Sequence, residues 1–465
     1  TPFEKSLAGE TPASGFPGPR GVPAREVSPR LFCDNALAMP LCNNSMRFPL
    51  AVFVVAISCW SACFASTNAD SAPATVYWEG SRLVEAKQES ADPSEEVKQA
   101  LRRLRTEADQ ALTRGPYSVM FKTETPPSGD KHDYMSFSRY WWPNPDTPDG
   151  LPYIRKDGQV NRALRRRGDR DQIGMMTQDV ALLSLAYFFF EDEKYADRAA
   201  ELIRAWFLDE ATRMNPHMKF GQAVPGRSVG RDVGILDARS FVKVLDSLPL
   251  LESSDAWDQA SSDQLEHWFR EYLSWLLISD LGREEAAGEN NHGSWFAAQA
   301  VRIALFVGKN DVAREIVRQV HQERIPMQFA SDGSQPEELE RTLSLHYSFF
   351  NLEALSIVAR AAESLGMDLW TSNSDGMGLR HGIDYLLPYV AGKKEWPFQQ
   401  IDEYSLSRGA IHTLRMASVR YQDARYLEPV EKLRQRYPEH DLACLLFHAV
   451  NDRGRRDAVA TDSGE

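Results

Sequence analysis

The sequence TQDVALLSLAYFFFEDEKYADRAAELIRAWFLD, residues 177–209, indicates the fold class of this chain. Its apolar residues recur at helical spacing on both sides of the polar stretch 191–193. This pattern is typical of two antiparallel helices joined by a tight turn. Because the alternation that strands show is scarce in the rest of the sequence, we expect an all-α protein.

Further helices are expected on both sides of this hairpin. Upstream, Asp92 is the expected N-cap of a helix that has Pro93 in its first turn and stops at Gly115 and Pro116. Downstream, the predicted helices cover residues 262–278, 294–306, 311–323, 347–365, 382–390 and 425–436.

A long series of helix pairs predicts either an α-solenoid or an α/α toroid built of antiparallel helical hairpins. The loops between the helices are long and rich in aromatic or polar residues, unlike the short connections of a plain solenoid. We therefore favour a toroid with a loop-built site at one end. We place this domain at residues 77–450, between a linker at 66–76 and a disordered tail at 451–465.

The composition is that of a folded protein that does not bind nucleic acid. The chain has 465 residues, of which 43% are hydrophobic and 10% aromatic, so it can bury a sizeable core. Its formal net charge of -13 argues against a nucleic-acid partner, because such proteins normally carry an excess of Lys and Arg. An acidic protein can still hold a polyanion in a locally basic cleft.

The N-terminal residues have the features of an export signal preceded by an extension. Residues 1–45 are rich in Pro, Gly and Ser and are expected to be a disordered upstream extension. Residues 46–65 begin with Met46 and Arg47, continue with an apolar run too short to span a bilayer, and end with small residues near Ala65. This predicts a signal peptide and a periplasmic or secreted mature protein without a membrane span.

The cysteine positions agree with export. Cys33, Cys42, Cys59 and Cys63 precede the predicted mature chain, so only Cys444 remains, in the apolar stretch DLACLLFHAV. One thiol can form neither an internal disulfide nor a cysteine metal site, and we expect it in the core. A lipoprotein anchor at Cys59 or Cys63 is the less favoured alternative, because the residues before either one match a lipobox poorly.

Helix packing does not account for four stretches of the sequence. The first, residues 133–161, places Tyr140, Trp141 and Trp142 in a loop rich in Pro and Gly. Flat aromatic faces beside polar groups suit the binding of sugars, although such rings can equally pin a long loop to the protein body. The second, residues 215–234, is a Gly-rich basic loop that could hold carboxylates or could simply be solvated. Its candidate residues are Asn215, His217, Gln222 and Arg227.

The third and fourth stretches supply groups for catalysis. Residues 288–296, GENNHGSWF, contain Asn291, His292 and Trp295. Residues 332–351 contain Arg341, His346 and Tyr347.

Together these stretches offer a base, a cation and a phenol, the set needed to abstract the C5 proton of a uronic acid. Arginine and amide donors on the neighbouring carboxylate favour the charge that develops, and one such donor is typically worth about 3–4 kcal/mol. A Tyr or His then takes the proton, and a phenol can return one to the leaving oxygen O4.

Other chemistries fit the sequence less well. A glycosidase needs two placed carboxylates, and nothing singles out a pair among residues such as Asp179, Glu289 and Glu338. The ten histidines never take the His-Glu-x-x-His spacing of a zinc site, and no Gly-x-Ser-x-Gly elbow is present. We therefore expect no metal and no cofactor.

Four segments resemble the alginate lyase superfamily of all-helical polysaccharide lyases, over roughly residues 77–437. They are DYMSFSRYWWPNPDTPDGLPYIRKDG (133–158), NNHGSWF (290–296), DGSQPEELERTLSLHYSFFNLEAL (332–355) and WPFQQI (396–401). The chain looks most similar to the branch that acts on alginate and glucuronan. The resemblance implies an incomplete barrel of helical hairpins, an α/α toroid, whose long loops form a groove or tunnel for a chain of uronates.

The resemblance also implies roles for individual residues. Tyr347 would be the acid, and also the base for syn elimination, whereas His292 would be the base for anti elimination. Asn291 and Arg341 would neutralise or position the substrate carboxylate. The predicted substrate contacts are Tyr140, Trp141, Trp142, Asn215, His217, Gln222, Arg227, Trp295 and His346.

The sequence departs from its relatives beside this motif. Where they commonly continue NNHGTWYD, this chain has NNHGSWFAAQ, so Phe296 lacks a hydroxyl and Ala297 lacks a carboxylate that could orient the site. These departures bear on subsite preference more than on the reaction class.

We expect a monomeric or weakly oligomeric lyase whose partner is an anionic polysaccharide. Mannuronate-rich alginate is the first candidate substrate and glucuronan the second. A non-catalytic uronan-binding protein on the same scaffold is the alternative of another class.

Overall fold

Helices α3 (Arg170–Phe190) and α4 (Glu193–Phe207) form the hairpin that the sequence predicts. Glu191 ends α3 in the left-handed region, with φ 53°, and its backbone N–H donates to the carbonyl of Tyr187. Asp192 then caps α4, because its side chain accepts from the N–H of Lys194. The turn therefore falls at the predicted residues.

The computed structural model describes residues 72–164, 167–371, 377–402, 406–436 and 442–450. These residues all belong to one compact unit, Thr67–Glu465. The predicted upstream extension at 1–45, the signal peptide at 46–65 and the tail at 451–465 lie outside the described residues.

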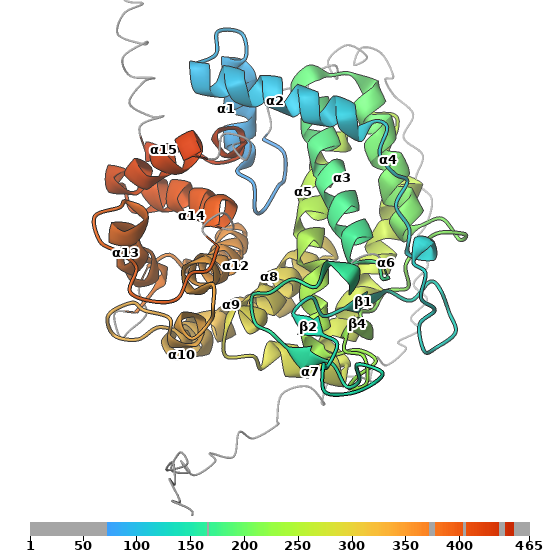
Figure 1. The fold of residues 1–465 in the computed structure, drawn as a ribbon. Coiled ribbons are helices and arrows are strands. Elements are labelled where there is room, and N and C mark those ends of the chain that lie inside the picture. Colours follow the sequence, from blue (N-terminus) through green and yellow to red (C-terminus); the bar gives the residue numbers. More distant parts are fainter. Residues whose placement is uncertain (1–71, 165–166, 372–376, 403–405, 437–441, 451–465) are drawn as a thin grey trace, which may run out of the picture. The chain divides into compact units, whose positions relative to one another are not determined.

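Within this unit, successive helices follow one another around a ring of hairpins, as Figure 1 shows. Helix α3 packs against its neighbours α2, α4 and α5, and α8 packs against α12, which in turn contacts α13 and α14. The remaining helices are α1 (Gly80–Glu89), α2 (Glu95–Ala111), α5 (Phe241–Leu251), α6 (Gln259–Ile278), α7 (Asp280–Ala286), α8 (Asn291–Phe306), α9 (Asn310–Gln319), α10 (Ile325–Gln328), α11 (Pro336–Leu339), α12 (Ser344–Ser364), α13 (Leu379–Val390), α14 (Ser407–Arg420), α15 (Leu427–Arg436) and α16 (Ala443–Leu446).

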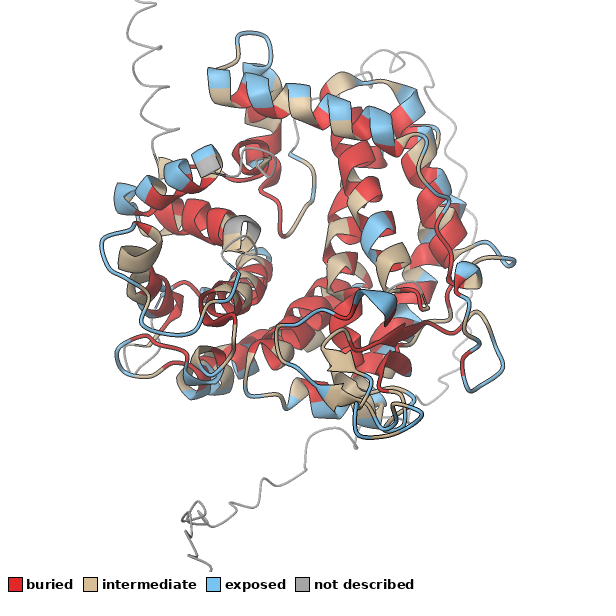
Figure 2. Cartoon of the chain, viewed as in Figure 1, coloured by how far each residue is buried: buried red, intermediate tan, exposed pale blue. Residues whose placement is uncertain are grey.

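The two ends of the ring meet. Helix α1 packs against α16, and the N–H of Glu79 donates to the carbonyl of Leu446 at 3.0 Å. The helix faces turned toward their neighbours are buried (Figure 2). They form one large apolar core that includes Cys444, which confirms the prediction for this cysteine.

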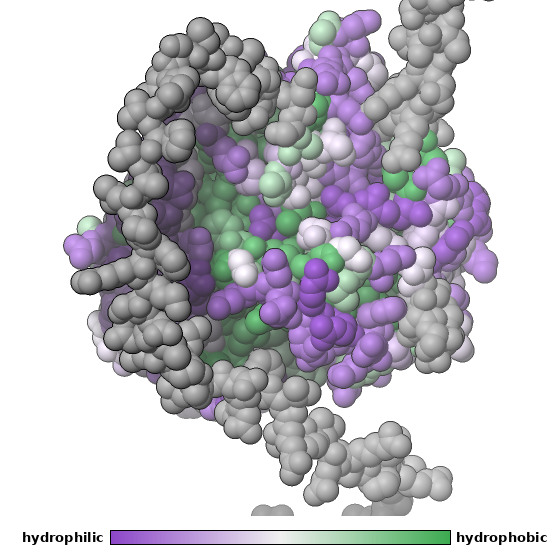
Figure 3. All heavy atoms as spheres, turned by 180° about the vertical axis from the view of Figure 1, so that it is seen from behind, coloured by the Kyte–Doolittle hydropathy of each residue, from purple (hydrophilic) through white to green (hydrophobic). Residues whose placement is uncertain are grey.

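Short strands shape the long loops. Strand β1 (Met135–Phe137) pairs in parallel with β4 (Phe220–Ala223), and β2 (Trp141–Trp142) pairs antiparallel with β3 (Ile154–Arg155). The loops also carry the 3-10 turns η1 (Val119–Phe121), η2 (Arg162–Leu164) and η3 (Asp232–Ser240). Seen from behind, the molecule is hollowed, and apolar side chains gather in the hollow beside hydrophilic residues (Figure 3).

The start of α2 differs from the prediction. Asp92 is not its N-cap, because the N–H of Asp92 donates to the carbonyl of Glu89 and so belongs to the turn that ends α1. Ser94 caps α2 instead, accepting from the N–H of Val97 at 3.3 Å, and Pro93 therefore lies outside the helix.

Other boundaries also differ. Helix α8 begins at Asn291 rather than Ser294, and α9 ends at Gln319, where a π-helical turn, Val320–Arg324, replaces the predicted last turn. The sequence did not predict helices α1, α5, α7, α10, α11, α14 and α16.

Helix α3 is long and apolar enough to cross a membrane. It has 21 residues, and its most apolar 18-residue stretch has a mean hydropathy of 1.4, but 72% of that stretch is buried within the protein. This is how the core helix of a folded domain behaves, so α3 gives little support for a membrane span. The expected absence of a span from the chain stays a prediction.

Candidate active site

The first turn of α8 carries the Asn-His pair. Asn290 caps the helix by accepting from the N–H of His292 at 3.0 Å. Arg324 donates to the carbonyls of Ala286 and Gly288, which fixes the turn between α7 and α8. A Cβ at Gly293 would lie 2.2 Å from the carbonyl oxygen of Gly288, so this close approach explains the glycine of the motif.

His292 is held by a buried carboxylate that the sequence did not reveal. Its Nδ1 lies 2.8 Å from Oε1 of Glu285 on α7. The His292 side chain keeps 20% of its surface exposed, whereas the Glu285 side chain keeps 2%, so the imidazole is the group that can meet a ligand. Burial raises the pKa of Glu285, and His292 opposes that rise. Because Nδ1 faces Glu285, Nε2 is the nitrogen available to accept a proton.

Asn291 is buried and tied to a second carboxylate. Its Nδ2 donates to Oε2 of Glu338 at 2.8 Å, and its backbone N–H donates to Oε1 at 2.6 Å. Its Oδ1 is buried without a hydrogen-bond partner among the described residues. Burial raises the pKa of Glu338 to about 7, although the bonds from Asn291 lower it. Asn291 therefore has no exposed surface with which to contact a substrate.

Tyr347 lies in the first turn of α12, between a phenol and a guanidinium. Its hydroxyl is 3.1 Å from the hydroxyl of Tyr140, and the Arg341 guanidinium lies 3.8 Å above its ring centroid. Nη2 of Arg341 also donates to Oδ1 of Asp157 at 3.1 Å. Burial opposes the ionisation of Asp157, but the bonds from Arg341 and other donors hold its pKa well below the usual range.

Arg139 is a further residue of this group that the sequence did not single out. Its guanidinium lies 4.8 Å from the ring centroid of Tyr140 and interacts with the Tyr347 phenol. Burial raises the pKa of Tyr140 to about 12, although Arg139 lowers it. Tyr140 therefore keeps its proton at neutral pH and can donate it in a hydrogen bond to Tyr347.

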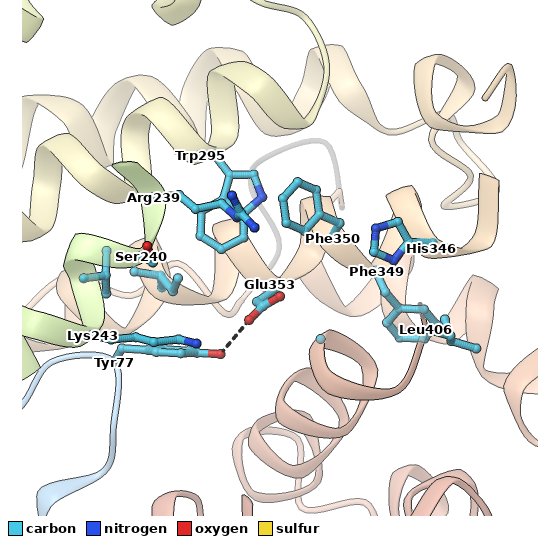
Figure 4. Close-up of a pocket in the computed structure, with 13 residues that line it drawn as sticks. Tyr77, Arg239, Ser240, Lys243, Trp295, His346, Phe349, Phe350, Glu353 and Leu406 are labelled. Carbon is cyan, nitrogen blue, oxygen red and sulfur yellow. Dashed lines mark hydrogen bonds between the residues drawn. The ribbon is translucent and has the colours of Figure 1, made fainter. Parts of the chain in front are cut away.

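Trp295 and His346 join this site as predicted neighbours. Trp295, on α8, packs on Phe350 of α12 with 4.9 Å between ring centroids. His346 stacks on the same ring at 5.7 Å. Trp295, Phe350 and His346 line a cavity of about 260 Å³ together with Arg239 (Figure 4).

Three other predicted substrate contacts make interactions with residues of the long loops: Trp141, Trp142 and Arg227. Trp141 lies under the guanidinium of Arg227 at 5.2 Å, and Nε1 of Trp142 donates to the carbonyl of Gln159. Arg227 also donates to the carbonyl of Tyr153. These rings brace the β2–β3 loop, which was the alternative that the sequence left open for them.

Asn215, His217 and Gln222 also fasten a loop to the protein body. Asn215 donates to Oδ1 of Asp133 at 2.7 Å, and Nε2 of His217 lies 3.0 Å from the same oxygen. Gln222 is buried and donates to Oδ1 of Asp237 at 3.2 Å. Within the described ranges, no contact joins these three side chains to Tyr347 or His292.

No group of three metal-binding side chains (His, Cys, Asp or Glu) is found in the part of the chain that the structure describes. The expected absence of a metal and a cofactor stays a prediction.

The site combines a phenol that lies between two arginines with a carboxylate-held histidine on the adjoining helix. Within an all-α toroid, these are the features of a polysaccharide lyase. The alginate lyase family model matches residues 118–396, which is more than half of the chain and includes the groups described above. The chain therefore belongs to the alginate lyase family, which confirms the resemblance seen in the sequence.

One solved structure agrees with this assignment. The chain is similar to an alginate lyase from Bacteroides ovatus, with 38% identity and a TM-score of 0.76, over 80% of this chain and 99% of that one. It is also similar to alginate lyase A1-III from Sphingomonas species A1, with 14% identity and a TM-score of 0.47, over 76% of this chain and 89% of that one. A search of curated proteins gave no match.

Proposed function

We propose that this lyase cleaves mannuronate-rich alginate by β-elimination. The observation that carries the proposal is the position of the Tyr347 phenol, 3.1 Å from the Tyr140 hydroxyl and beneath the Arg341 guanidinium at 3.8 Å. A phenol held in this way can exchange a proton with a bound sugar while positive charge nearby stabilises its anion.

The proposed reaction needs one base and one acid. The base removes the proton from C5 of the uronate that follows the scissile bond. The electron pair left on C5 forms the C4–C5 double bond, the bond between C4 and O4 breaks, and O4 takes a proton. No water is consumed, so the new non-reducing end is an unsaturated uronate.

For mannuronate, one residue can do both steps. The C5 proton and O4 lie on the same face of the sugar ring, so Tyr347, once it has lost its own proton, can take the C5 proton as a phenolate and then pass it to O4, which restores the phenolate. The negative charge of that phenolate lies on the Tyr347 oxygen, where Tyr140 can donate a hydrogen bond and the guanidiniums of Arg139 and Arg341 lie close. One preorganised donor of this kind is typically worth about 3–4 kcal/mol of barrier.

For guluronate, the C5 proton lies on the opposite face of the ring, and we assign its removal to His292. Glu285 holds Nδ1 at 2.8 Å, which leaves Nε2 as the basic nitrogen. When the imidazole takes the proton, the buried Glu285 carboxylate stabilises the resulting cation.

The substrate carboxylate also needs a positive partner. We assign this role to Arg341, with Arg139 beside it. Asn291 was expected to share the role, but its bonds to Glu338 and its burial support a different one: it fixes the first turn of α8 and so positions His292. Arg341 keeps its own position through Asp157.

Glucuronan is the second candidate substrate. Glucuronate shares the C4 and C5 configuration of mannuronate and differs at C2, so the same syn elimination could serve both polymers.

We also propose that the protein is exported by the signal peptide at 46–65 and acts in the periplasm or outside the cell. Amino-terminal sequencing of the mature protein tests this, and a terminus upstream of Met46 would contradict it.

The experiment that tests the function is to incubate the purified protein separately with polymannuronate, polyguluronate and glucuronan. The ultraviolet absorbance of the unsaturated product is followed, and we expect the fastest rise with polymannuronate. A faster rise with glucuronan would change the assigned substrate. No rise with any of the three, from folded protein, would contradict the proposal.

A further inference from the structure

Arg239, at the end of η3, is a cation that the catalytic account does not use. It lines two cavities, of about 260 Å³ and about 470 Å³, which share Arg239, Ser240 and Lys243. Its side chain is half-buried. Burial and the charges of Arg170 and Arg139 together lower the pKa of Arg239 to about 10.

Arg239 has no carboxylate in ion-pair contact among the described residues. Its Nη1 donates to the backbone carbonyl of Leu236 at 3.1 Å. The two carboxylates that favour its charge, Asp237 and Glu353, have other partners. Asp237 pairs with Arg170 at 3.2 Å, and Glu353 accepts from the Tyr77 hydroxyl at 3.2 Å.

A half-buried cation that lines a cavity without a carboxylate partner has a free-energy cost. Arg302, a buried arginine of the core, is paired with Asp246 at 3.0 Å, whereas Arg324 is satisfied by the carbonyls of Ala286 and Gly288. The arginine lining the cavities is therefore suited to an anion that comes from outside the chain.

The surroundings of Arg239 are those of a sugar site. Its guanidinium lies 5.9 Å from the ring centroid of Trp295 and 5.4 Å from that of Phe350. Nε1 of Trp295 is buried and has no hydrogen-bond partner within the described residues. Aromatic faces beside polar donors suit a pyranose ring. Figure 4 shows these groups around one cavity.

Phe350 connects this place to the catalytic centre. Its ring lies 6.3 Å from the ring of Tyr347 and 5.4 Å from the Arg239 guanidinium. His346, next to Tyr347 in the chain, lines the same cavity as Arg239. The ring of Phe350 thus lies between Tyr347, the proposed acid, and the Arg239 guanidinium.

We propose that Arg239 binds the carboxylate of a second uronate residue, away from the bond being cleaved, with Trp295 and Phe350 beside that sugar. The proposal rests on the proposed function, because it takes the ligand to be the same uronan chain. The site fixes the register of the chain, and it is engaged only by oligomers long enough to reach both Tyr347 and Arg239.

The test is the binding of mannuronate oligomers of increasing length, measured by calorimetry. Binding is measured in Tyr347→Phe protein, so that the oligomers are not consumed, with and without Arg239→Met. We expect Arg239→Met to weaken the binding of the longer oligomers at least tenfold, about 1.4 kcal/mol, and to leave that of the shortest binding oligomer unchanged. Arg270→Gln is the matched loss of charge on an exposed helix face, where Arg270 pairs with Glu266, and we expect it to change nothing.

Thermal unfolding separates ligand binding from a structural role. Because Arg239 has no acidic partner, Arg239→Met is expected to keep or raise the melting temperature of the ligand-free protein. Long oligomers should raise the melting temperature of the Tyr347→Phe protein, and this increase should be lost when Arg239→Met is added. Equal affinities for all lengths with and without Arg239→Met would overturn the proposal, as would a lowered melting temperature with oligomer binding unchanged. Failure of the proposed function looks different: the wild-type protein would bind uronan oligomers without producing unsaturated ends.

Discussion

Replacing Tyr140 by Phe removes one hydroxyl from the site and leaves the ring in place. That hydroxyl lies 3.1 Å from the Tyr347 hydroxyl, which is slightly longer than the usual O–H···O distance of about 2.7–2.8 Å. In the resting enzyme the bond is therefore weak. It becomes a hydrogen bond to a charged group as Tyr347 gives up its proton, and such bonds are worth about 1.5–3 kcal/mol.

This difference between the ground state and the transition state sets the expected effect. Losing about 1.5–3 kcal/mol from the transition state alone lowers kcat by about 10- to 100-fold. The ring that Arg139 covers at 4.8 Å is retained, so we expect KM to change by less than about threefold.

The assay is the initial rate of unsaturated product formation on polymannuronate, with kcat and KM determined separately. Tyr195→Phe is the matched control, because its hydroxyl donates to Asp109 at 2.7 Å on the outer helices, and its kcat should stay at the wild-type value. A Tyr140→Phe enzyme with wild-type kcat would refute the hydrogen bond to the reacting phenol. A raised KM with unchanged kcat would make Tyr140 a binding residue only.

Three further predictions concern the charged groups of the site. Glu285→Gln is expected to lower the rate on polyguluronate about tenfold or more and to affect polymannuronate less; equal losses in the two initial rates would contradict the separate roles of His292 and Tyr347. Arg341→Lys keeps the charge but loses the planar stacking over Tyr347, so kcat on polymannuronate should fall about tenfold, and an unchanged kcat would contradict the role of the guanidinium. Glu338 has a pKa of about 7 in the folded protein, against an ordinary value of 4.5 for a glutamate, so between these values the folded state binds more protons, and the free energy of unfolding falls as the pH rises from about 5 to about 8. Glu338→Gln should flatten that fall in denaturant unfolding measured across this range, and an identical slope would show that Glu338 does not cause it.

The sequence was sufficient to predict the helical class and the two helices that carry the site. Periodicity and turn residues are local properties, so the α3–α4 hairpin was predicted with its turn at Glu191 and Asp192. The Asn-His motif was recognised, but the start of α8 was not, because a helix that begins with Asn291 and His292 lacks the apolar spacing on which the prediction relied.

The partners of the catalytic residues could not be predicted in the same way. Glu285 lies near the end of the short helix α7, seven residues before His292, and whether the two meet depends on the angle between α7 and α8. Arg139 reaches Tyr347 from a loop far away in sequence. Arg239 lies in a 3-10 stretch with no amphipathic pattern. Contacts of this kind are set by tertiary packing rather than by local spacing.

The aromatic loop shows a different limit. The resemblance implied that Tyr140, Trp141 and Trp142 contact the substrate, while composition left open that these rings brace the loop. The Tyr140 hydroxyl contacts a proposed catalytic residue, and the two tryptophans contact other residues of the loops; sugar contacts of the three rings stay a prediction. Rings in a Pro-rich segment can do either, and the sequence alone carries no information about which face is free.

The most direct test of elimination by Tyr347 is mass spectrometry of the products formed from polymannuronate in water labelled with heavy oxygen, with wild-type protein and with Tyr347→Phe. For the wild type we predict unsaturated oligomers that carry no heavy oxygen from cleavage, because no water is consumed, and for Tyr347→Phe we predict almost no product. Saturated oligomers with one heavy oxygen for each bond cleaved would show hydrolysis and contradict the account. Wild-type amounts of unsaturated product from Tyr347→Phe would agree with elimination but would contradict the catalytic role of Tyr347.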